Sequence, residues 1–144
     1  MTIHRMTLSW QFVRFILVGL VNTFTGLSVI FAMKAILSVG DVLANSVGYA
    51  IGLCVSFTLN RTWTFGHTGS IAPAMVKFLF VFAVAYVTNL TVVLICIHWI
   101  GLNTYLAQAM GIPPYTIVFF LLSRFFVFAS EDGKTASVRV PSIH

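Results

Sequence analysis

Two short stretches of the sequence place an arginine directly behind a long apolar run and follow it with aromatic residues. They are LNRTWTF at positions 59–65, which contains Arg61, and LSRFFVF at positions 122–128, which contains Arg124. A guanidinium offers a planar fork of N–H donors that matches the oxygens of a phosphate group. Basic residues and aromatic rings also anchor helices at a membrane surface. The pattern therefore leaves two interpretations open, phosphate recognition and membrane anchoring.

Amide side chains inside the apolar runs form a second group of candidates. An amide in lipid is costly unless it finds a hydrogen-bond partner, either on another helix or on a ligand. Between positions 45 and 60, small and amide side chains recur every three or four residues and so share one helix face; these are Asn45, Gly48, Gly52, Ser56 and Asn60. The Gly-x-x-x-Gly spacing on this face favours helix–helix contact for the glycines.

The cations and the amides together define a candidate substrate-binding set. Such a set would hold a phosphate or another anionic head group with its cations and hydrogen-bond a polar group with its amides. Its members are Arg14, Asn22, Asn45, Asn60, Arg61, Trp63, Lys77, Asn89 and Arg124.

Residues suited to catalysis or metal binding form no pattern. The three acidic residues, Asp41, Glu131 and Asp132, all lie outside the apolar runs, and no Walker A, HExxH or GxSxG motif is present. Cys54 and Cys96 lack metal-ligand spacing, so we interpret them as small buried hydrophobic residues. We therefore expect no catalytic residues, no metal and no cofactor, which means that the protein is not an enzyme. The missing intramembrane carboxylate also argues against proton-coupled export.

The composition is that of an integral membrane protein. Of the 144 residues, 59% are hydrophobic and only 8% are charged, and the mean hydropathy is +1.00. Soluble proteins average about 25% charged residues. The net charge of +5 lies mostly beside the apolar runs, so the positive-inside bias of membrane proteins explains it better than nucleic-acid binding does.

The apolar runs predict an all-α membrane protein with four transmembrane helices, at about 15–37, 42–59, 78–100 and 105–122. Eighteen helical residues span about 27 Å, close to the thickness of a hydrocarbon core. Alternation with a period of two residues, which a β-barrel needs, is absent. The pair Pro113-Pro114 predicts a kink in the fourth helix. We expect a single four-helix domain over residues 1–128 and a disordered cytoplasmic tail over 129–144.

Basic residues at the ends of the spans predict the orientation. Seven of them fall on the side that carries both termini, whereas Lys34 is alone on the other side. Since basic residues concentrate on the cytoplasmic side, both termini are expected inside, N-in and C-in. The seven are Arg5, Arg14, Arg61, Lys77, Arg124, Lys134 and Arg139.

An internal duplication relates the two halves of the chain. Residues 14–66 align with 77–129 without a gap, an offset of 63 residues that pairs Arg61 with Arg124 and Arg14 with Lys77. Each unit is a helical hairpin, so the two units would share one orientation and form a parallel repeat. Substrate sites of repeat-built transporters lie at the interface between the repeats.

These motifs resemble the GtrA-like family of small four-helix membrane proteins. The resemblance rests on RFILVGLVNT at 14–23, on LANSVGYAIGLCVSFTLNRTWTF at 43–65 and on the weaker echo of KF and LSRFFVF in the second half, and it covers residues 14–128. It implies translocation of a polyprenyl-phosphate-linked monosaccharide across the cytoplasmic membrane of a bacterium or archaeon, for cell-surface polysaccharide synthesis. The positions that match the family motifs are Arg14, Asn22, Asn45, Asn60, Arg61, Trp63 and Arg124.

Two further functions compete with translocation. The first is a membrane anchor that recruits a glycosyltransferase without transporting anything, in which the arginines only set the topology. The second is a small-molecule exporter, for which the sequence offers no intramembrane carboxylate. Because four helices bury little around a substrate, we expect a homo-oligomer or a complex with a membrane glycosyltransferase. The expected ligands are a polyprenyl-phosphate-linked sugar and membrane lipid, not nucleic acid.

Overall fold

The structure of the protein is a computed structural model that describes residues 7–129. The predicted tail at 129–144 lies outside the described residues except for Ala129. Three of the basic residues behind the predicted orientation, Arg5, Lys134 and Arg139, lie outside them as well. The orientation therefore stays a prediction.

Four α-helices and two five-residue π-helices make up the described chain. In order they are α1 (Leu8–Leu37), α2 (Asp41–Leu59), η1 (Asn60–Thr64), α3 (Ile71–His98), α4 (Thr104–Leu122) and η2 (Ser123–Val127). Four helical segments, two of them α-helices extended by η1 and η2, are long and apolar enough to cross a membrane. The prediction of four transmembrane helices is confirmed, and the chain is a multi-pass, all-helical membrane protein with no strand within residues 7–129.

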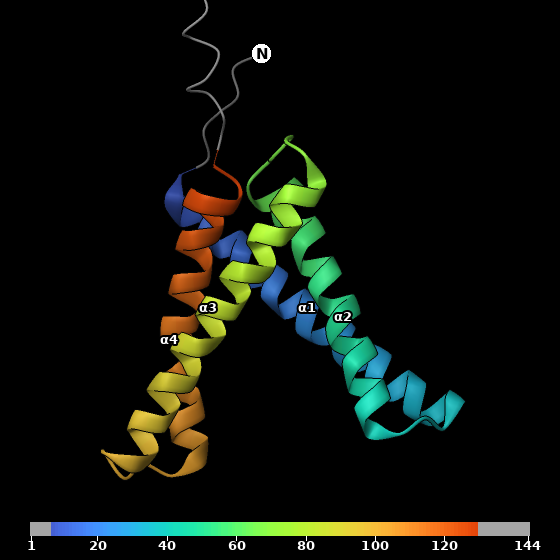
Figure 1. The fold of residues 1–144 in the computed structure, drawn as a ribbon, viewed down its shortest axis with the longest axis vertical. Coiled ribbons are helices and arrows are strands. Elements are labelled where there is room, and N and C mark those ends of the chain that lie inside the picture. Colours follow the sequence, from blue (N-terminus) through green and yellow to red (C-terminus); the bar gives the residue numbers. More distant parts are fainter. Residues whose placement is uncertain (1–6, 130–144) are drawn as a thin grey trace, which may run out of the picture.

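The helices form two hairpins that diverge from a common end (Figure 1). Helix α1 packs along α2, and α3 packs along α4. The start of α1, both π-helices and the start of α3 gather at one end of the molecule, which we call the junction end. Toward the opposite end the hairpins separate and leave a wide V.

Several helix boundaries differ from the prediction because the predicted spans began directly after a basic residue, Arg14 or Lys77, and the helices run through these residues. Helix α1 begins at Leu8 rather than at residue 15, and α3 begins at Ile71 rather than at residue 78. Pro73 fits in the first turn of α3, where backbone N–H groups have no intrahelical partner in any case. One α-helix runs through Pro113 and Pro114, so the proline pair does not end α4.

The two outer turns are closed by local chemistry. In the first hairpin, Ser38 caps α1 in the left-handed conformation, with a φ of 51°, and Lys34 forms a salt bridge with Asp41 across the turn. In the second hairpin, the side chain of Asn103 accepts a hydrogen bond of 2.9 Å from the backbone N–H of Leu106 and so caps the start of α4.

One cysteine differs from its predicted environment. Cys96 is buried, as expected, but Cys54 is exposed. The reason is the helix face: α2 packs on α1 through Gly48, Gly52 and Ser56, which are buried, and Cys54 lies outside that face.

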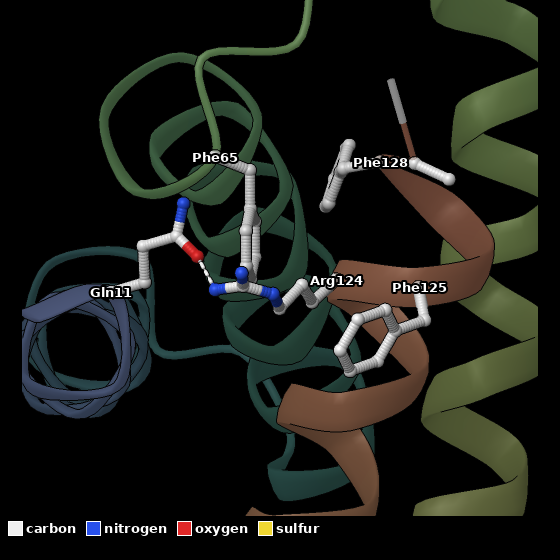
Figure 2. A pocket seen from close by; sticks show the side chains of 6 residues that line it. Gln11, Phe65, Arg124, Phe125 and Phe128 are labelled. Carbon is white, nitrogen blue, oxygen red and sulfur yellow. Dashed lines mark hydrogen bonds between the residues drawn. The ribbon is translucent and has the colours of Figure 1, made fainter. Parts of the chain in front are cut away.

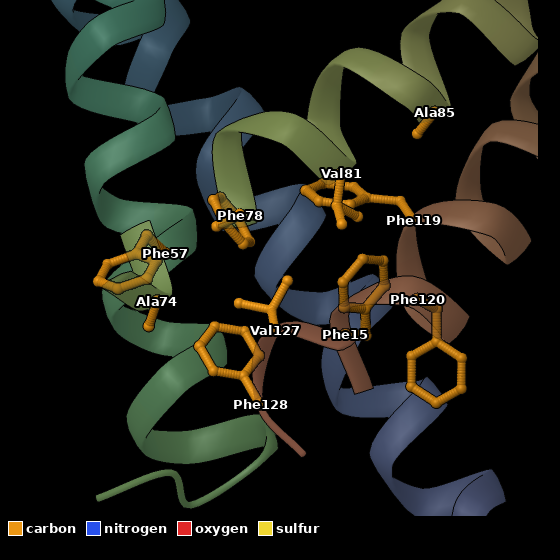
Figure 3. Close-up of a cluster of buried hydrophobic side chains, with 10 residues drawn as sticks. All are labelled: Phe15, Phe57, Ala74, Phe78, Val81, Ala85, Phe119, Phe120, Val127 and Phe128. Atoms are coloured by element: carbon orange, nitrogen blue, oxygen red, sulfur yellow. The ribbon is translucent and has the colours of Figure 1, made fainter. Parts of the chain in front are cut away.

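Aromatic rings build most of the contact between the hairpins. Each ring pair adds about 0.5–1.5 kcal/mol beyond the burial of its area. The ring contacts between the two hairpins that the structure shows within residues 7–129 lie close to the junction end. The core cluster there consists of Phe15, Phe57, Ala74, Phe78, Val81, Ala85, Phe119, Phe120, Val127 and Phe128 (Figure 3).

The ring contacts are reciprocal between the halves. Phe57 of α2 meets Phe78 of α3 with ring centroids 5.4 Å apart, and their counterparts in the alignment, Phe120 of α4 and Phe15 of α1, meet at 5.5 Å. Each half therefore inserts the last turn of its second helix against the first helix of the other half. A two-fold relation between duplicated halves would produce this exchange.

A stacked pair of rings lies between these two contacts. Phe65 directly follows η1 and Phe128 directly follows η2, and their rings stack with centroids 5.2 Å apart. Phe57 reaches Phe128 at 5.9 Å, and its counterpart Phe120 reaches Phe65 at the same distance. These matched distances support the duplication, and the parallel orientation of the repeat stays a prediction.

Within each hairpin, a glycine lets the two helices approach closely. A Cβ added to Gly48 would lie 2.9 Å from the carbonyl oxygen of Gly26 and would clash with the side chain of Ile30. The counterpart Gly111 on α4 faces the side chains of Asn89 and Val93 instead of a backbone. The first hairpin is therefore packed backbone to backbone, whereas the second is packed through side chains.

Candidate functional site

The two π-helices are the local structures that carry the arginines. In η1 the N–H of Phe65 reaches the carbonyl of Asn60 at 2.9 Å, and in η2 the N–H of Phe128 reaches the carbonyl of Ser123 at 2.8 Å. Arg61 and Arg124 are each the second residue of their π-helix. Such turns are rare and are frequently found at functional sites. The sequence alignment paired these positions, but no residue type in them predicted a π-helix.

Arg14 is held by two tryptophans. Its Nη1 donates to the carbonyl oxygen of Trp63 at 2.8 Å, and its guanidinium carbon lies 5.0 Å from the ring centroid of Trp63 and 5.5 Å from that of Trp10. Its Nε is buried and has no hydrogen-bond partner. Arg14 thus ties the start of α1 to η1, which is a structural role.

Lys77 repeats this arrangement in the second half with fewer contacts. Its Nζ lies 5.4 Å from the ring centroid of Phe126, the counterpart of Trp63. Lys77 is exposed, and no tryptophan flanks it on the other side, because the position that matches Trp10 is Pro73.

Arg61 is bound to its own loop. Its Nη2 donates to the carbonyl oxygen of Gly69 at 2.5 Å, eight residues along the chain, and so closes the connection between η1 and α3. Its Nε is buried without a hydrogen-bond partner. Arg61 is half-buried, and its guanidinium stabilises the connection between η1 and α3.

Arg124 reaches across to the other half. Its Nη1 donates to Oε1 of Gln11 on α1, and its guanidinium carbon lies 5.3 Å from the ring centroid of Phe125 (Figure 2). A guanidinium only donates hydrogen bonds, so the oxygen of Gln11 must face it and the NH₂ group must point away. The figure shows that arrangement.

A pocket of about 230 Å³ opens beside Arg124. One guanidinium and one amide supply its polar groups, and aromatic rings supply most of the remaining wall (Figure 2). The lining residues are Gln11, Phe65, Arg124, Phe125, Phe128 and Ala129.

Three buried polar side chains in the π-helices have atoms without partners. Asn60 is 1% exposed and donates through Nδ2 to Oγ of Ser56 at 3.3 Å, but its Oδ1 accepts nothing. The hydroxyls of Thr64 and Ser123 are fully buried and have no hydrogen-bond partner in the structure. Leaving such a group unpaired costs about 1–3 kcal/mol.

The remaining amides lie away from the junction end. Asn22 packs its amide against Gly52, and Asn89 packs its amide against Gly111, so both sit between the two helices of their own hairpin. Asn45 lies near the outer turn and donates to the carbonyl of Asp41 at 2.8 Å. The structure thus brings Arg14, Asn60, Arg61, Trp63, Lys77 and Arg124 to one end and leaves Asn22, Asn45 and Asn89 along the helices.

Hydroxyl groups on the helices bond to their own backbone. The side chains of Thr23, Ser28, Thr58, Thr88 and Thr116, among others, donate to the carbonyl four residues earlier at 2.8–3.0 Å. Such bonds let a hydroxyl face lipid without an unpaired donor. These hydroxyls are therefore adapted to a lipid environment and do not form a polar path.

Sequence reasoning missed Gln11, Phe65 and Phe128 as site residues. Phe65 and Phe128 carried a usable signal, since they are identical across the duplication. Gln11 carried none, because it precedes the aligned region and its contact with Arg124 joins residues 113 positions apart. Among residues 7–129, no group of three or more His, Cys, Asp or Glu side chains is arranged to hold a metal ion.

A sequence-family model described as the GtrA/DPMS transmembrane domain matches residues 14–128. No curated protein matches the chain significantly.

Proposed function

Because the chain belongs to the GtrA/DPMS transmembrane domain family, we propose that it moves a polyprenyl-phosphate-linked monosaccharide across the cytoplasmic membrane of a bacterium or archaeon. The sugar would then serve cell-surface polysaccharide synthesis on the far side. In this proposal both termini, and with them the junction end, face the cytoplasm, where the sugar lipid is made.

The observation that carries the proposal is the gathering of Arg14, Arg61, Lys77 and Arg124 at one end of two hairpins that separate toward the other end. A cationic end attracts the phosphate of a lipid head group. The open V leaves room for a polyprenyl chain to stay in lipid while its head group crosses. Transport at such a junction of two repeats has precedent among transporters.

The proposal includes no energy source within the chain. The only acidic residue among the described residues is Asp41, which is paired with Lys34 at the outer turn. Proton relays in membranes usually rest on an intramembrane carboxylate. Movement is then facilitated, and it is driven by consumption of the sugar lipid on the far side.

A proteoliposome assay tests the proposal. Vesicles would contain a polyprenyl-phosphate monosaccharide with a nitrobenzoxadiazole label, and dithionite would quench only the outer leaflet. We expect the quenched fraction to rise from the outer leaflet alone to nearly the whole pool when the protein is present. Vesicles with an unrelated four-helix membrane protein are the control. Identical quenching in both sets of vesicles, across a panel of sugars, would refute translocation.

A non-transporting anchor is the second candidate, and the hydroxyl bonds favour it. Because the Ser and Thr side chains and Asn45 bond to their own helices, few free polar groups lie along the bundle to guide a sugar. In this function the helical bundle, as a monomer or as a homo-oligomer of this chain, binds a membrane glycosyltransferase and keeps it at the membrane. An anchor would co-purify with its glycosyltransferase and yet leave quenching unchanged in the assay above.

A further inference from the structure

We propose that the pocket between Arg124 and Gln11 is the head-group binding site, and that each chain has only one such site because its counterpart around Arg61 is closed. The proposal rests on the function proposed above and names the residues and the ligand class of its binding step. The ligand is a lipid with one phosphate group that carries a single sugar ring.

Two differences separate the counterpart position around Arg61 from the pocket beside Arg124. At the same offset of 63 residues, just before the aligned region, Gln11 corresponds to Ala74, which is 3% exposed and offers no polar side-chain group. The Gly69 carbonyl takes Nη2 of Arg61 instead. Each arginine therefore makes one such bond, but that of Arg61 goes to its own loop, whereas Arg124 stands in the wall of an open pocket.

The cations of the first helices do not replace Arg124. Arg14 is fixed by the Trp63 carbonyl and between two indole rings. Lys77 is a point charge at the exposed surface over Phe126, without the planar fork of a guanidinium. One guanidinium with a free edge can pair with one phosphate group in a bidentate manner.

The rest of the pocket fits a small sugar. Its volume of about 230 Å³ lies below the range of roughly 300–1,000 Å³ that drug-sized ligands occupy. The NH₂ group of Gln11 points away from Arg124 and is available to a hydroxyl or phosphate oxygen. Ring faces of Phe65, Phe125 and Phe128 provide apolar surface for the C–H groups of a sugar. Because there is one guanidinium and little volume, a diphosphate or an oligosaccharide fits poorly.

The test measures binding by native mass spectrometry of the detergent-solubilised full chain. The probes are farnesyl phosphate, farnesyl phosphate glucose, farnesyl diphosphate, farnesol and inorganic phosphate. We expect farnesyl phosphate glucose to bind most tightly and farnesol not to bind. Inorganic phosphate separates a site for free anions from a site for lipid head groups, and it is expected to bind far more weakly than farnesyl phosphate. Equal affinity for farnesol and farnesyl phosphate, or tightest binding of the diphosphate, would overturn the proposed ligand.

Matched variants locate the site. Arg124→Gln is expected to weaken binding of farnesyl phosphate by at least about tenfold, because a charge-assisted hydrogen bond is lost. Arg61→Gln, at the duplicated position, lowers the charge of the junction end but removes no contact with the head group, so it is expected to weaken binding clearly less than Arg124→Gln does. Equal losses in these two variants would overturn the assignment to a single site.

Two milder variants keep the test valid if Arg124→Gln does not fold, as judged by its helical circular dichroism. Gln11→Ala removes one neutral partner and is expected to weaken binding about three- to tenfold. Phe125→Ala, at an exposed ring, is expected to abolish the advantage of farnesyl phosphate glucose over farnesyl phosphate. Wild-type affinities in both variants would contradict the site.

These experiments can refute the proposed binding site and the proposed transport function independently of each other. If the variants behave as expected but the proteoliposomes show no flipping, the site stands and the proposed function falls. If flipping occurs while Arg124→Gln and Arg61→Gln bind equally, the function stands and the site falls.

Discussion

The two halves of the molecule share a scaffold and differ in chemistry. The ring contact between Phe57 and Phe78 corresponds to the contact between Phe120 and Phe15, at nearly the same distance. In each half the second helix ends in a π-helix whose second residue is an arginine. In the first half that arginine bonds to a loop carbonyl, and in the second half it faces a pocket.

The difference arises at positions next to the scaffold and leaves the scaffold itself intact. Arg124 gains a hydrogen-bond partner in the other half because Gln11 stands there, whereas Ala74 stands at the corresponding position for Arg61. The neighbouring cations differ as well: Arg14 lies 5.0 Å from the ring centroid of Trp63, and Lys77 lies 5.4 Å from that of Phe126. Duplicated halves can therefore keep the same packing geometry although a few side chains differ. These side chains give the arginine of one half a structural role and leave the arginine of the other half accessible to a ligand.

The largest expected loss of stability comes from substituting the glycine that packs the helices of the first hairpin, and the same substitution in the second hairpin should cost less. Gly48→Ala would force its Cβ against the backbone carbonyl of Gly26, at 2.9 Å, and should cost about 1–3 kcal/mol. Gly111→Ala meets only the side chains of Asn89 and Val93, which can move, so its cost should be smaller. Equilibrium unfolding in sodium dodecyl sulfate measures both. A larger loss for Gly111→Ala would contradict the difference in packing.

A smaller effect, opposite in sign between the halves, is expected inside the π-helices. Ser123→Ala removes a fully buried hydroxyl that has no partner, so it should stabilise the protein by up to about 1 kcal/mol. Asn60→Ala loses the hydrogen bond to Ser56 and leaves a cavity, so it should destabilise the protein. The same unfolding assay gives both values. Destabilisation by Ser123→Ala would show that its hydroxyl has a partner, such as a bound water.

The smallest effect compares the two cation–aromatic contacts. Trp63→Leu removes one of the two rings that flank Arg14 and should cost about 0.5–1 kcal/mol, while the carbonyl that Arg14 bonds to remains. Phe126→Leu removes a ring below the exposed Lys77 and should cost less. Thermal melting at low and high salt checks the order. The reverse order would mean that Lys77, and not Arg14, is the anchored cation.

Much of the fold followed from the sequence, since long apolar runs in lipid have few alternatives to helices. The four spans were predicted, and the gapless offset paired residues that turn out to make reciprocal contacts, such as Phe65 and Phe128. The starts of α1 and α3, at Leu8 and Ile71, were each predicted seven residues too late, because the predicted spans began after the basic residues Arg14 and Lys77, which the helices include.

The site was predictable only in part. Residue type identified Arg61 and Arg124 equally, and nothing local distinguished them. What separates them is a contact with Gln11, far away in the sequence, and a carbonyl at Gly69 that any residue type could provide. Asn22 and Asn89 were candidates by polarity, but each packs on a glycine of its partner helix, which only the register of the hairpins determines.

The most direct test of the unequal halves is the flipping rate of two variants in proteoliposomes, measured side by side with the wild type. If Arg124 alone contacts the head group, Arg124→Gln should slow flipping by more than about tenfold. Arg61→Gln, which only lowers the charge of the junction end, should slow it clearly less once equal folding and reconstitution are verified. Equal slowing in the two variants, or a loss confined to Arg61→Gln, would contradict the account.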